Sequence, residues 1–199
     1  MLRLAGIFLL FFPIFVQAGA QKMEGAVCNS ASAGLFAAAA YRPVTRQQFV
    51  ARFASQKKAM AWLSAMSKRL KKRIPNPKER EDFLMTVHYE ANRSSLDPQL
   101  ILGIIQVESS FNKYAVSVAD ARGYMQVMPF WPKLCGDPDP NLFHMRRNLR
   151  YGCMILLGYL KMEKGDYFRA LGRYNGSLGK AAYPNLVKNA WHGNWAYSS

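Results

Sequence analysis

The segment DPQLILGIIQVESS, residues 97–110, contains the pattern that decides the fold of this chain. It begins with Asp97 followed by a proline, and an acidic N-cap with proline at the first helical position is a typical helix start. Apolar side chains then recur three and four residues apart, at Ile101, Ile104 and Ile105, so they share one helix face. Glu108 falls on the same face, in the last turn. The segment therefore predicts a buried helix that carries a carboxylate near its C-terminal end.

Two interpretations of Glu108 follow from this position. Desolvation on an apolar face favours the protonated carboxyl group, and the negative end of the helix dipole acts in the same direction. A carboxylic acid that stays protonated near neutral pH is suited to general-acid attack on a glycosidic oxygen. The alternative is a structural glutamate paired with one of the 27 Lys and Arg side chains, and spacing alone slightly favours it. Every other acid is expected to lie in a polar environment.

The rest of the chain predicts a mainly helical domain. Its 199 residues, of which 50% are hydrophobic, suit one domain of ordinary size. Helical apolar spacing also occurs in residues 81–92, 147–163, 167–174 and 183–191. Runs with a period of two are scarce, so any sheet is small. The expected fold class is α+β, mainly α, with a small β element and a basic helical segment in front of it.

That basic segment comprises residues 42–80, which contain twelve basic side chains and one acid and so carry +11 of the net charge of +15. Its apolar spacing predicts one amphipathic helix that ends at Pro75-Asn76-Pro77. The apolar residues on the shared face are Phe49, Phe53, Met60, Leu63, Met66 and Leu70. The default interpretation is a docked helix with a solvated basic face. The alternative is an anionic envelope partner, either a cell-envelope polymer or phospholipid headgroups; nucleic acid would fit the charge, but export argues against it.

Residues 1–20 are predicted to be a signal peptide. A basic start, an apolar stretch and the small residues AGA at positions 18–20 predict export with cleavage after Ala20. An uncleaved membrane anchor is the alternative, but the apolar stretch is short and is interrupted by a proline. Cys28 follows Val27, where a lipidation signal needs Gly or Ala, so we expect a soluble periplasmic protein.

Three cysteines in an exported chain predict one disulfide and one remaining cysteine. Cys135 lies in a stretch rich in Pro, Gly and Asp, and Cys153 lies in the helical pattern that follows. They are eighteen positions apart, and we expect them to pair and to leave Cys28 out. The alternative, three buried free thiols, is disfavoured outside the cytosol.

Several motif blocks follow one another in order along residues 108–187. They are Glu108-Ser109-Ser110-Phe111, Ser117, Ala121-Arg122-Gly123-Tyr124-Met125-Gln126-Val127-Met128-Pro129, Tyr174-Asn175-Gly176 and Tyr183-Pro184-Asn185-Leu186-Val187. Together they resemble the soluble lytic transglycosylases of bacterial cell walls over residues 81–191, more than half of the chain. The resemblance implies a lysozyme-like domain at 79–199. In front of it we expect the signal peptide at 1–20 and a basic, helical N-terminal segment at 21–78, to which we assign no counterpart in the family.

The resemblance also implies the site. Glu108 matches the single catalytic glutamate, and Tyr183 matches a tyrosine that hydrogen-bonds it. Substrate-binding positions are matched by Ser117, Gln126, Met128, Asn175 and Tyr183. Structural alternatives exist for four of them: turn formation for Ser117 and Asn175, and core packing for Met128 and Tyr183.

The activity implied by this family is a carbon–oxygen lyase reaction. Such enzymes cleave the β-1,4 bond between N-acetylmuramic acid and N-acetylglucosamine without water and form 1,6-anhydromuramoyl ends. Hydrolases usually place two carboxylates across the bond, and Asp120 is the only nearby second acid. The alternatives are a hydrolytic muramidase and a non-catalytic glycan-binding module.

Few partners and no cofactors are expected. The expected partners are peptidoglycan glycan strands, and a secretion or conjugation apparatus is a further candidate. We expect no organic cofactor and no metal, because His88, His144 and His192 show no ligand spacing.

Overall fold

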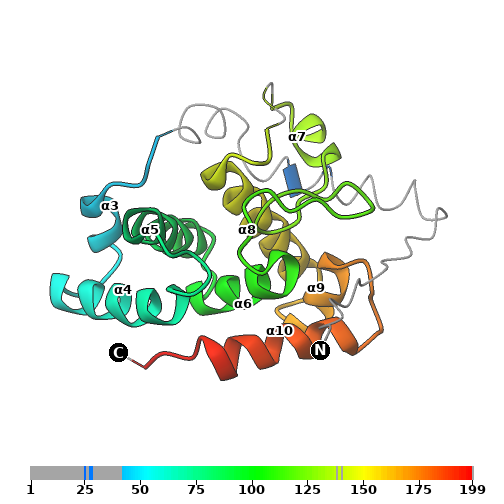
Figure 1. Cartoon of the computed structure of the whole chain (residues 1–199). Coiled ribbons are helices and arrows are strands. Elements are labelled where there is room, and N and C mark those ends of the chain that lie inside the picture. The colour runs from blue at the N-terminus through cyan, green and yellow to red at the C-terminus, as the bar shows by residue number, and fades with distance from the viewer. Residues whose placement is uncertain (1–24, 26, 29–41, 138, 140, 199) are drawn as a thin grey trace, which may run out of the picture.

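The computed structural model describes residues 25, 27–28, 42–137, 139 and 141–198, and the expected signal peptide at 1–20 lies outside them. The described part is mainly helical, which confirms the expected fold class (Figure 1). In chain order the elements are α3 (Arg46–Val50), α4 (Gln56–Leu70), α5 (Pro77–Arg93), α6 (Pro98–Ser109), α7 (Phe130–Leu134), α8 (Met145–Met162), α9 (Tyr167–Tyr174), α10 (Ala182–Asn189) and the π-helix η1 (Ala190–Asn194). Among the described residues, β pairing is limited to two isolated bridges, Val116 with Arg122 and Arg122 with Val127.

Helix α6 lies at the centre of the fold, as its sequence predicts. Asp97 caps it by accepting a hydrogen bond from the Gln99 backbone N–H at 2.8 Å, and residues 100–105 are all buried. Gly103 allows η1 to approach closely, since a Cβ there would lie 3.1 Å from the backbone nitrogen of Trp191. The helix ends at Ser109, one residue short of the quoted segment. Its position between α5, α10 and η1 therefore holds the last turn in a defined place.

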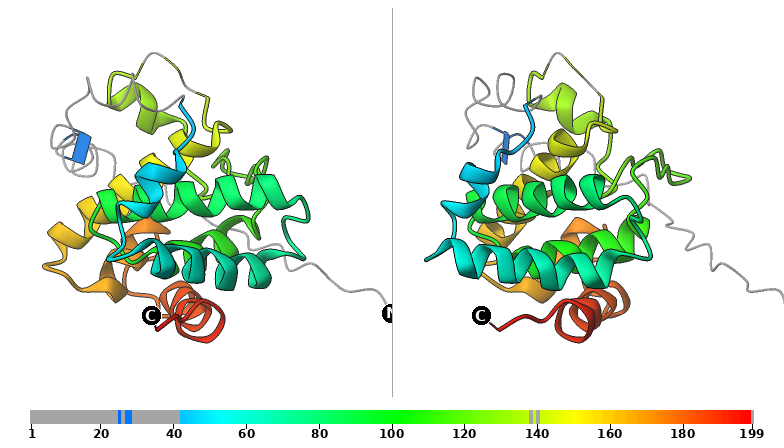
Figure 2. Two further views of the ribbon diagram at one scale, coloured as in Figure 1. Left: turned by 90° about the vertical axis from the view of Figure 1, so that its left-hand side faces the viewer. Right: turned by 60° about the vertical axis from the view of Figure 1, so that its left-hand side comes forward.

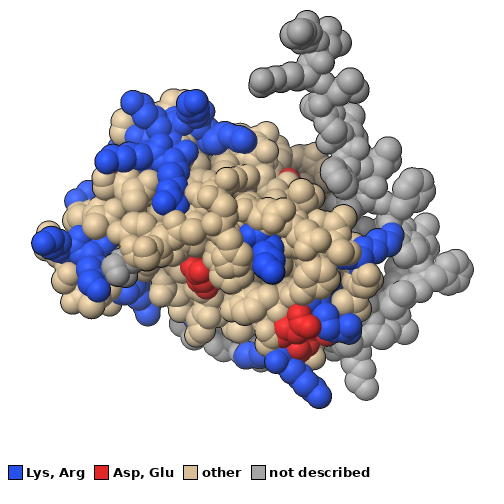
Figure 3. All heavy atoms as spheres, turned by 90° about the horizontal axis from the view of Figure 1, so that it is seen from below, with Lys and Arg blue, Asp and Glu red and all other residues tan. Residues whose placement is uncertain are grey.

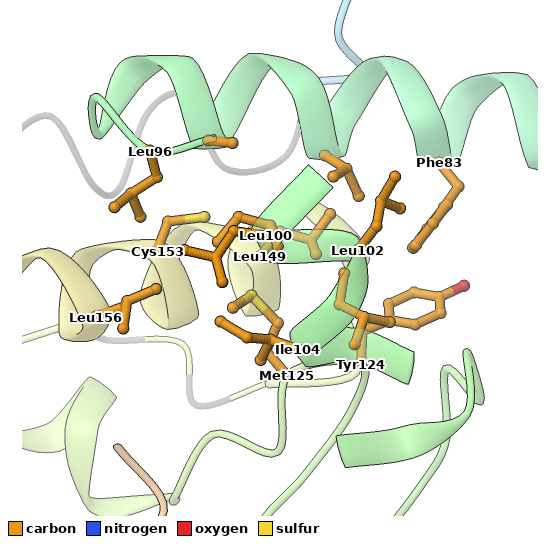
Figure 4. Packing of buried hydrophobic residues seen from close by; sticks show 14 of the residues in the cluster. Phe83, Leu96, Leu100, Leu102, Ile104, Tyr124, Met125, Leu149, Cys153 and Leu156 are labelled. Atoms are coloured by element: carbon orange, nitrogen blue, oxygen red, sulfur yellow. The ribbon is translucent and has the colours of Figure 1, made fainter. Parts of the chain in front are cut away.

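The hydrophobic core joins α6 to α8. Figure 4 shows Leu100 and Ile104 of α6 beside Leu149 and Cys153 of α8, and all four side chains are fully buried. This interior position results from the apolar spacing along α8, which places every third or fourth residue on one face. The core thus fixes the C-terminal half of the chain around α6.

The basic segment is built differently from the prediction. The expected single helix is wrong: Thr45 caps α3 and Ser55 caps a separate α4, each side chain accepting a backbone N–H at 3.2 Å. The Ser55 side chain accepts an N–H group that a continuous helix would have bonded to its own backbone. The helix is therefore interrupted at residues 51–55. Figure 2 shows α4 beside α5. Both helices contribute to one core, and the expected boundary after residue 78 lies inside α5.

No helix in the described part of the chain is long and apolar enough to span a membrane.

The disulfide also differs from the prediction. Cys135 pairs with Cys28 across a Cα–Cα distance of 5.0 Å, and Cys153 is a buried free thiol, so the expected bridge between Cys135 and Cys153 is wrong. The reason is packing. Cys153 lies on the inward face of α8 at 0% exposure, whereas Val27 packs against Gly158 of the same helix and brings its neighbour Cys28 to the end of α7.

Candidate active site

A carboxyl group and a phenol from distant parts of the chain meet at the end of α6. The Tyr183 hydroxyl, in the first turn of α10, donates a hydrogen bond to Oε1 of Glu108 at 2.5 Å. Tyr183 is buried, and Glu108 keeps part of its surface exposed. The structure therefore places a carboxyl group against a buried phenol, on a residue that is itself only partly exposed.

Desolvation sets the protonation of this group. Burial raises the pKa of Glu108 to about 7, and the hydrogen bond from Tyr183 acts in the opposite direction by stabilising the carboxylate. The pKa of Tyr183 is raised well above its usual value, first by burial and then by the negative charge of Glu108, so the phenol stays protonated and remains the donor. A carboxyl group with a pKa of about 7 can both give and take a proton near neutral pH.

A second tyrosine supports the site from α9. Tyr174 donates a hydrogen bond from its hydroxyl to the backbone carbonyl of Met125 at 2.8 Å. Burial, followed by the charge of Glu108, raises the pKa of Tyr174 well above its usual value. Sequence reasoning gave this residue no individual role, although it opens the Tyr174-Asn175-Gly176 block.

The loop of residues 112–127 contains two of the expected substrate-binding side chains. Ser117 accepts a hydrogen bond from the Ala121 backbone N–H at 3.0 Å, which closes a turn. Gln126 adopts a positive φ of 48° and donates from Nε2 to the carbonyls of Ala115 and Gly123 at 3.1 and 3.0 Å. Both side chains thus hold the loop in its present conformation.

Besides the hydrogen bond from Tyr174, three side-chain contacts attach this loop to the helical core. Ser109, next to Glu108 in sequence, donates to the carbonyl of Tyr124 at 2.8 Å. Asn148 of α8 is buried, donates to the carbonyl of Arg122 at 2.7 Å and accepts from the Met125 backbone N–H at 2.8 Å. Ser109 was visible in its motif, whereas Asn148 lies among three arginines in residues 145–150, outside every motif block, and only the tertiary structure identifies it.

The other expected positions lie around this arrangement without contacting the carboxyl group through a hydrogen bond. Met128 is partly buried against the core, and Asn175 is the C-cap of α9. Within the described residues, Tyr183 is the only expected site residue that hydrogen-bonds Glu108.

The remaining acids near the core are paired, and two of them are buried, contrary to expectation. Asp120 forms a two-point ion pair with Arg122 at 3.0 and 2.9 Å on the surface. Glu90, at 1% exposure, pairs with two arginines of α8, and Asp137 pairs with a third, Arg147. Glu90 was missed because its arginine partners lie more than 50 residues away in the sequence. The part of the chain that the structure describes contains no group of three or more His, Cys, Asp or Glu side chains that could hold a metal ion.

Comparison with known proteins places the site in a family. Residues 85–190 match the model of the family described as "Transglycosylase SLT domain", more than half of the chain. A protein named "Membrane-bound lytic murein transglycosylase C" from Actinobacillus pleuropneumoniae serotype 5b (strain L20) is 55% identical over 98 residues, 45% of this chain and 26% of the relative. A protein of the same name from Haemophilus influenzae (strain PittEE) is 53% identical over 47 residues, 24% of this chain and 13% of the relative.

This chain therefore spans about a quarter or less of the length of these relatives. No solved structure matches it. The matched residues contain Glu108, Tyr183 and the loop between them, and their mainly helical arrangement agrees with the lysozyme-like fold of the matched family. The chain belongs to the Transglycosylase SLT domain family.

Proposed function

We propose that this chain cleaves the β-1,4 bond between N-acetylmuramic acid and N-acetylglucosamine in peptidoglycan. The reaction is non-hydrolytic and forms 1,6-anhydromuramoyl ends. Glu108 is the single acid and base of the reaction. The observation that carries the proposal is the Glu108 carboxyl group, whose pKa of about 7 results from burial while Tyr183 donates to one of its oxygens.

In the first step the protonated Glu108 donates its proton to the glycosidic oxygen. The bond between that oxygen and C1 of the muramoyl residue breaks, and the N-acetyl carbonyl of the same sugar stabilises the positive charge at C1. Glu108 is then a carboxylate, and the hydrogen bond from Tyr183 favours that form.

In the second step the carboxylate accepts the proton of the sugar's own 6-hydroxyl group while the oxygen attacks C1. This closes the anhydro ring and returns Glu108 to its protonated form, so no water is consumed. A second carboxylate is not required, and Asp120 is engaged by Arg122 in a two-point pair. That pairing supports a lyase over a hydrolase with two carboxylates.

The remaining expected positions have proposed roles in holding the glycan. Ser117 would lie near the N-acetyl group, and Gln126, Met128 and Asn175 would line the strand. The names of the relatives support murein as the substrate class. With cleavage of the signal peptide after Ala20, the site of action would be the periplasm, during wall turnover or at a secretion or conjugation apparatus.

Digestion of purified peptidoglycan, followed by mass spectrometry of the released fragments, tests this function. The wild-type chain is expected to release fragments lighter by one water than those of a muramidase, and Glu108→Gln to release none. Glu79→Gln removes an exposed glutamate and is the matched control, expected to act like wild type. Hydrated products would establish a muramidase, and a wild-type chain that binds glycan without releasing fragments would establish a binding module.

A further inference from the structure

The basic side chains of residues 42–80 divide into two groups. Several are already engaged: Arg46 pairs with Glu81, and Arg80 is buried and donates to the carbonyls of Ile74 and Pro75 at 2.6 and 2.9 Å. These contacts stabilise the folded segment, and the charges of Arg46 and Arg80 are therefore not available to a partner.

The second group lies at the end of α4 and in the turn that follows. Residues 68–78 contain six basic side chains and no acid. Lys68, Lys71, Lys72 and Lys78 are exposed and form no ion pair among the described residues. We call residues 68–78 the basic turn. Figure 3 shows the face formed in part by α4 and α10: Lys and Arg side chains gather at its upper left, whereas acidic side chains are visible near the centre and at the lower right.

The basic turn is held beside the C-terminal end of α6. Arg73 donates to the carbonyl of Ser110, two residues after Glu108, at 3.4 Å. Arg69 donates to the carbonyls of Asn194, the last residue of η1, and Ala196 at 3.1 and 2.8 Å. Cations near a helix C-terminus are favourable, which explains these two arginines. It does not explain the exposed lysines beside them, which repel one another and remain without a counter-charge.

The chemistry of this surface favours a hydrophilic anionic partner. No large hydrophobic side chain of residues 42–80 is exposed, so the segment offers nothing to insert into a bilayer. The basic turn also lies outside residues 85–190, the part that the family model matches.

We infer that the basic turn binds the carboxylates of the peptide stems that project from the muramoyl residues of the substrate strand. This inference rests on the proposed function, because the stems belong to the same polymer that Glu108 would cleave. Arg73 bonds the carbonyl two residues after Glu108, so stems on a strand bound at Glu108 would lie within reach of the basic turn.

Binding measurements in the Glu108→Gln background test the inference without cleavage. The variant Lys68→Gln/Lys71→Gln/Lys72→Gln is compared with Lys133→Gln/Lys161→Gln/Lys164→Gln, which removes three exposed charges from other parts of the chain. The ligands are glycan strands with stems, the same strands after enzymatic removal of the stems, and vesicles of phosphatidylglycerol. The Glu108→Gln chain is expected to bind stem-bearing strands more tightly than stem-free strands, by a margin that shrinks as salt rises.

The first triple variant should lose roughly ten-fold in affinity for stem-bearing strands, since three exposed ion pairs are removed, and the second should lose little. Equal binding of both strand types by the Glu108→Gln chain, or an equal loss in the two triple variants, would overturn the inference. A loss confined to the vesicles would overturn it in favour of a membrane-facing surface. The proposed function is tested by a different measurement: it fails if the chain with intact Glu108 does not cleave peptidoglycan.

Discussion

Replacing Glu108 by glutamine should stabilise the fold above neutral pH while it removes activity. The pKa of Glu108 in the folded chain is about 7, against an ordinary value of 4.5. The folded state therefore binds this proton more tightly than the unfolded state does. The resulting stability is fully present below pH 4.5 and is lost as the pH rises through 7. Glutamine keeps the shape and can still accept the hydrogen bond from Tyr183, but it never acquires a charge.

The size of the effect follows from the two pKa values. The difference between 7 and 4.5 corresponds to about 3 kcal/mol, at about 1.4 kcal/mol per pKa unit. Because Glu108 is partly exposed, water screens the charge, and we expect a gain of about 1–3 kcal/mol for Glu108→Gln at high pH relative to acid pH.

Urea unfolding at pH 4.5 and at pH 8.5, both flanking the pKa of about 7, measures this gain. The free energy of unfolding of Glu108→Gln minus that of wild type should increase between the two pH values. The control Glu79→Gln removes an exposed carboxylate and should show a difference of a few tenths of a kcal/mol at most, roughly the scale of surface substitutions. A pH-independent difference for Glu108→Gln, or one that falls toward high pH, would refute the assignment of a desolvated carboxyl group.

Three further substitutions test other parts of the structure. Tyr183→Phe removes the donor that lowers the pKa of Glu108, so the alkaline limb of the pH–rate profile should move up by about one pH unit; an unchanged limb would contradict this. Cys28→Ser opens a bridge of sequence separation 107 and should lower the free energy of unfolding by about 4–5 kcal/mol in the chain-entropy model. Non-reducing peptide mapping should join Cys28 to Cys135, and any other pairing would disprove the bridge. Glu90→Gln leaves two buried arginines without their anion and should cost about 3–5 kcal/mol in urea unfolding; a cost below about 1 kcal/mol would show that water reaches them.

Much of the helical fold could be predicted because its signals are local. The cap at Asp97 and the following proline act within a few residues, and α6 begins where they predict. The apolar spacing of residues 167–174 matches α9 to the residue. The same spacing places Glu108 on the buried face of its helix, so the unusual chemical character of that carboxyl group was already visible in the sequence.

The family could be identified from the sequence because several motif blocks occur together in the expected order. The motif order could not decide whether Ser117 forms a turn or contacts a ligand, and it assigned Gln126 to the glycan alone. In the structure both side chains hydrogen-bond the loop backbone. Spacing also could not locate Asn148, whose importance lies in the backbone groups it reaches on the far side of a loop.

The sequence by itself therefore determined the helices α5, α6, α8, α9 and α10, the face on which Glu108 lies and the family. Only the tertiary structure decided which groups meet: Cys28 with Cys135, Glu90 with the arginines of α8, and the distance from Tyr183 to Glu108. The physical reason is range. Caps and apolar periods depend on neighbours three or four residues apart, whereas these contacts join positions 56 to 107 residues apart and form only when the whole core packs.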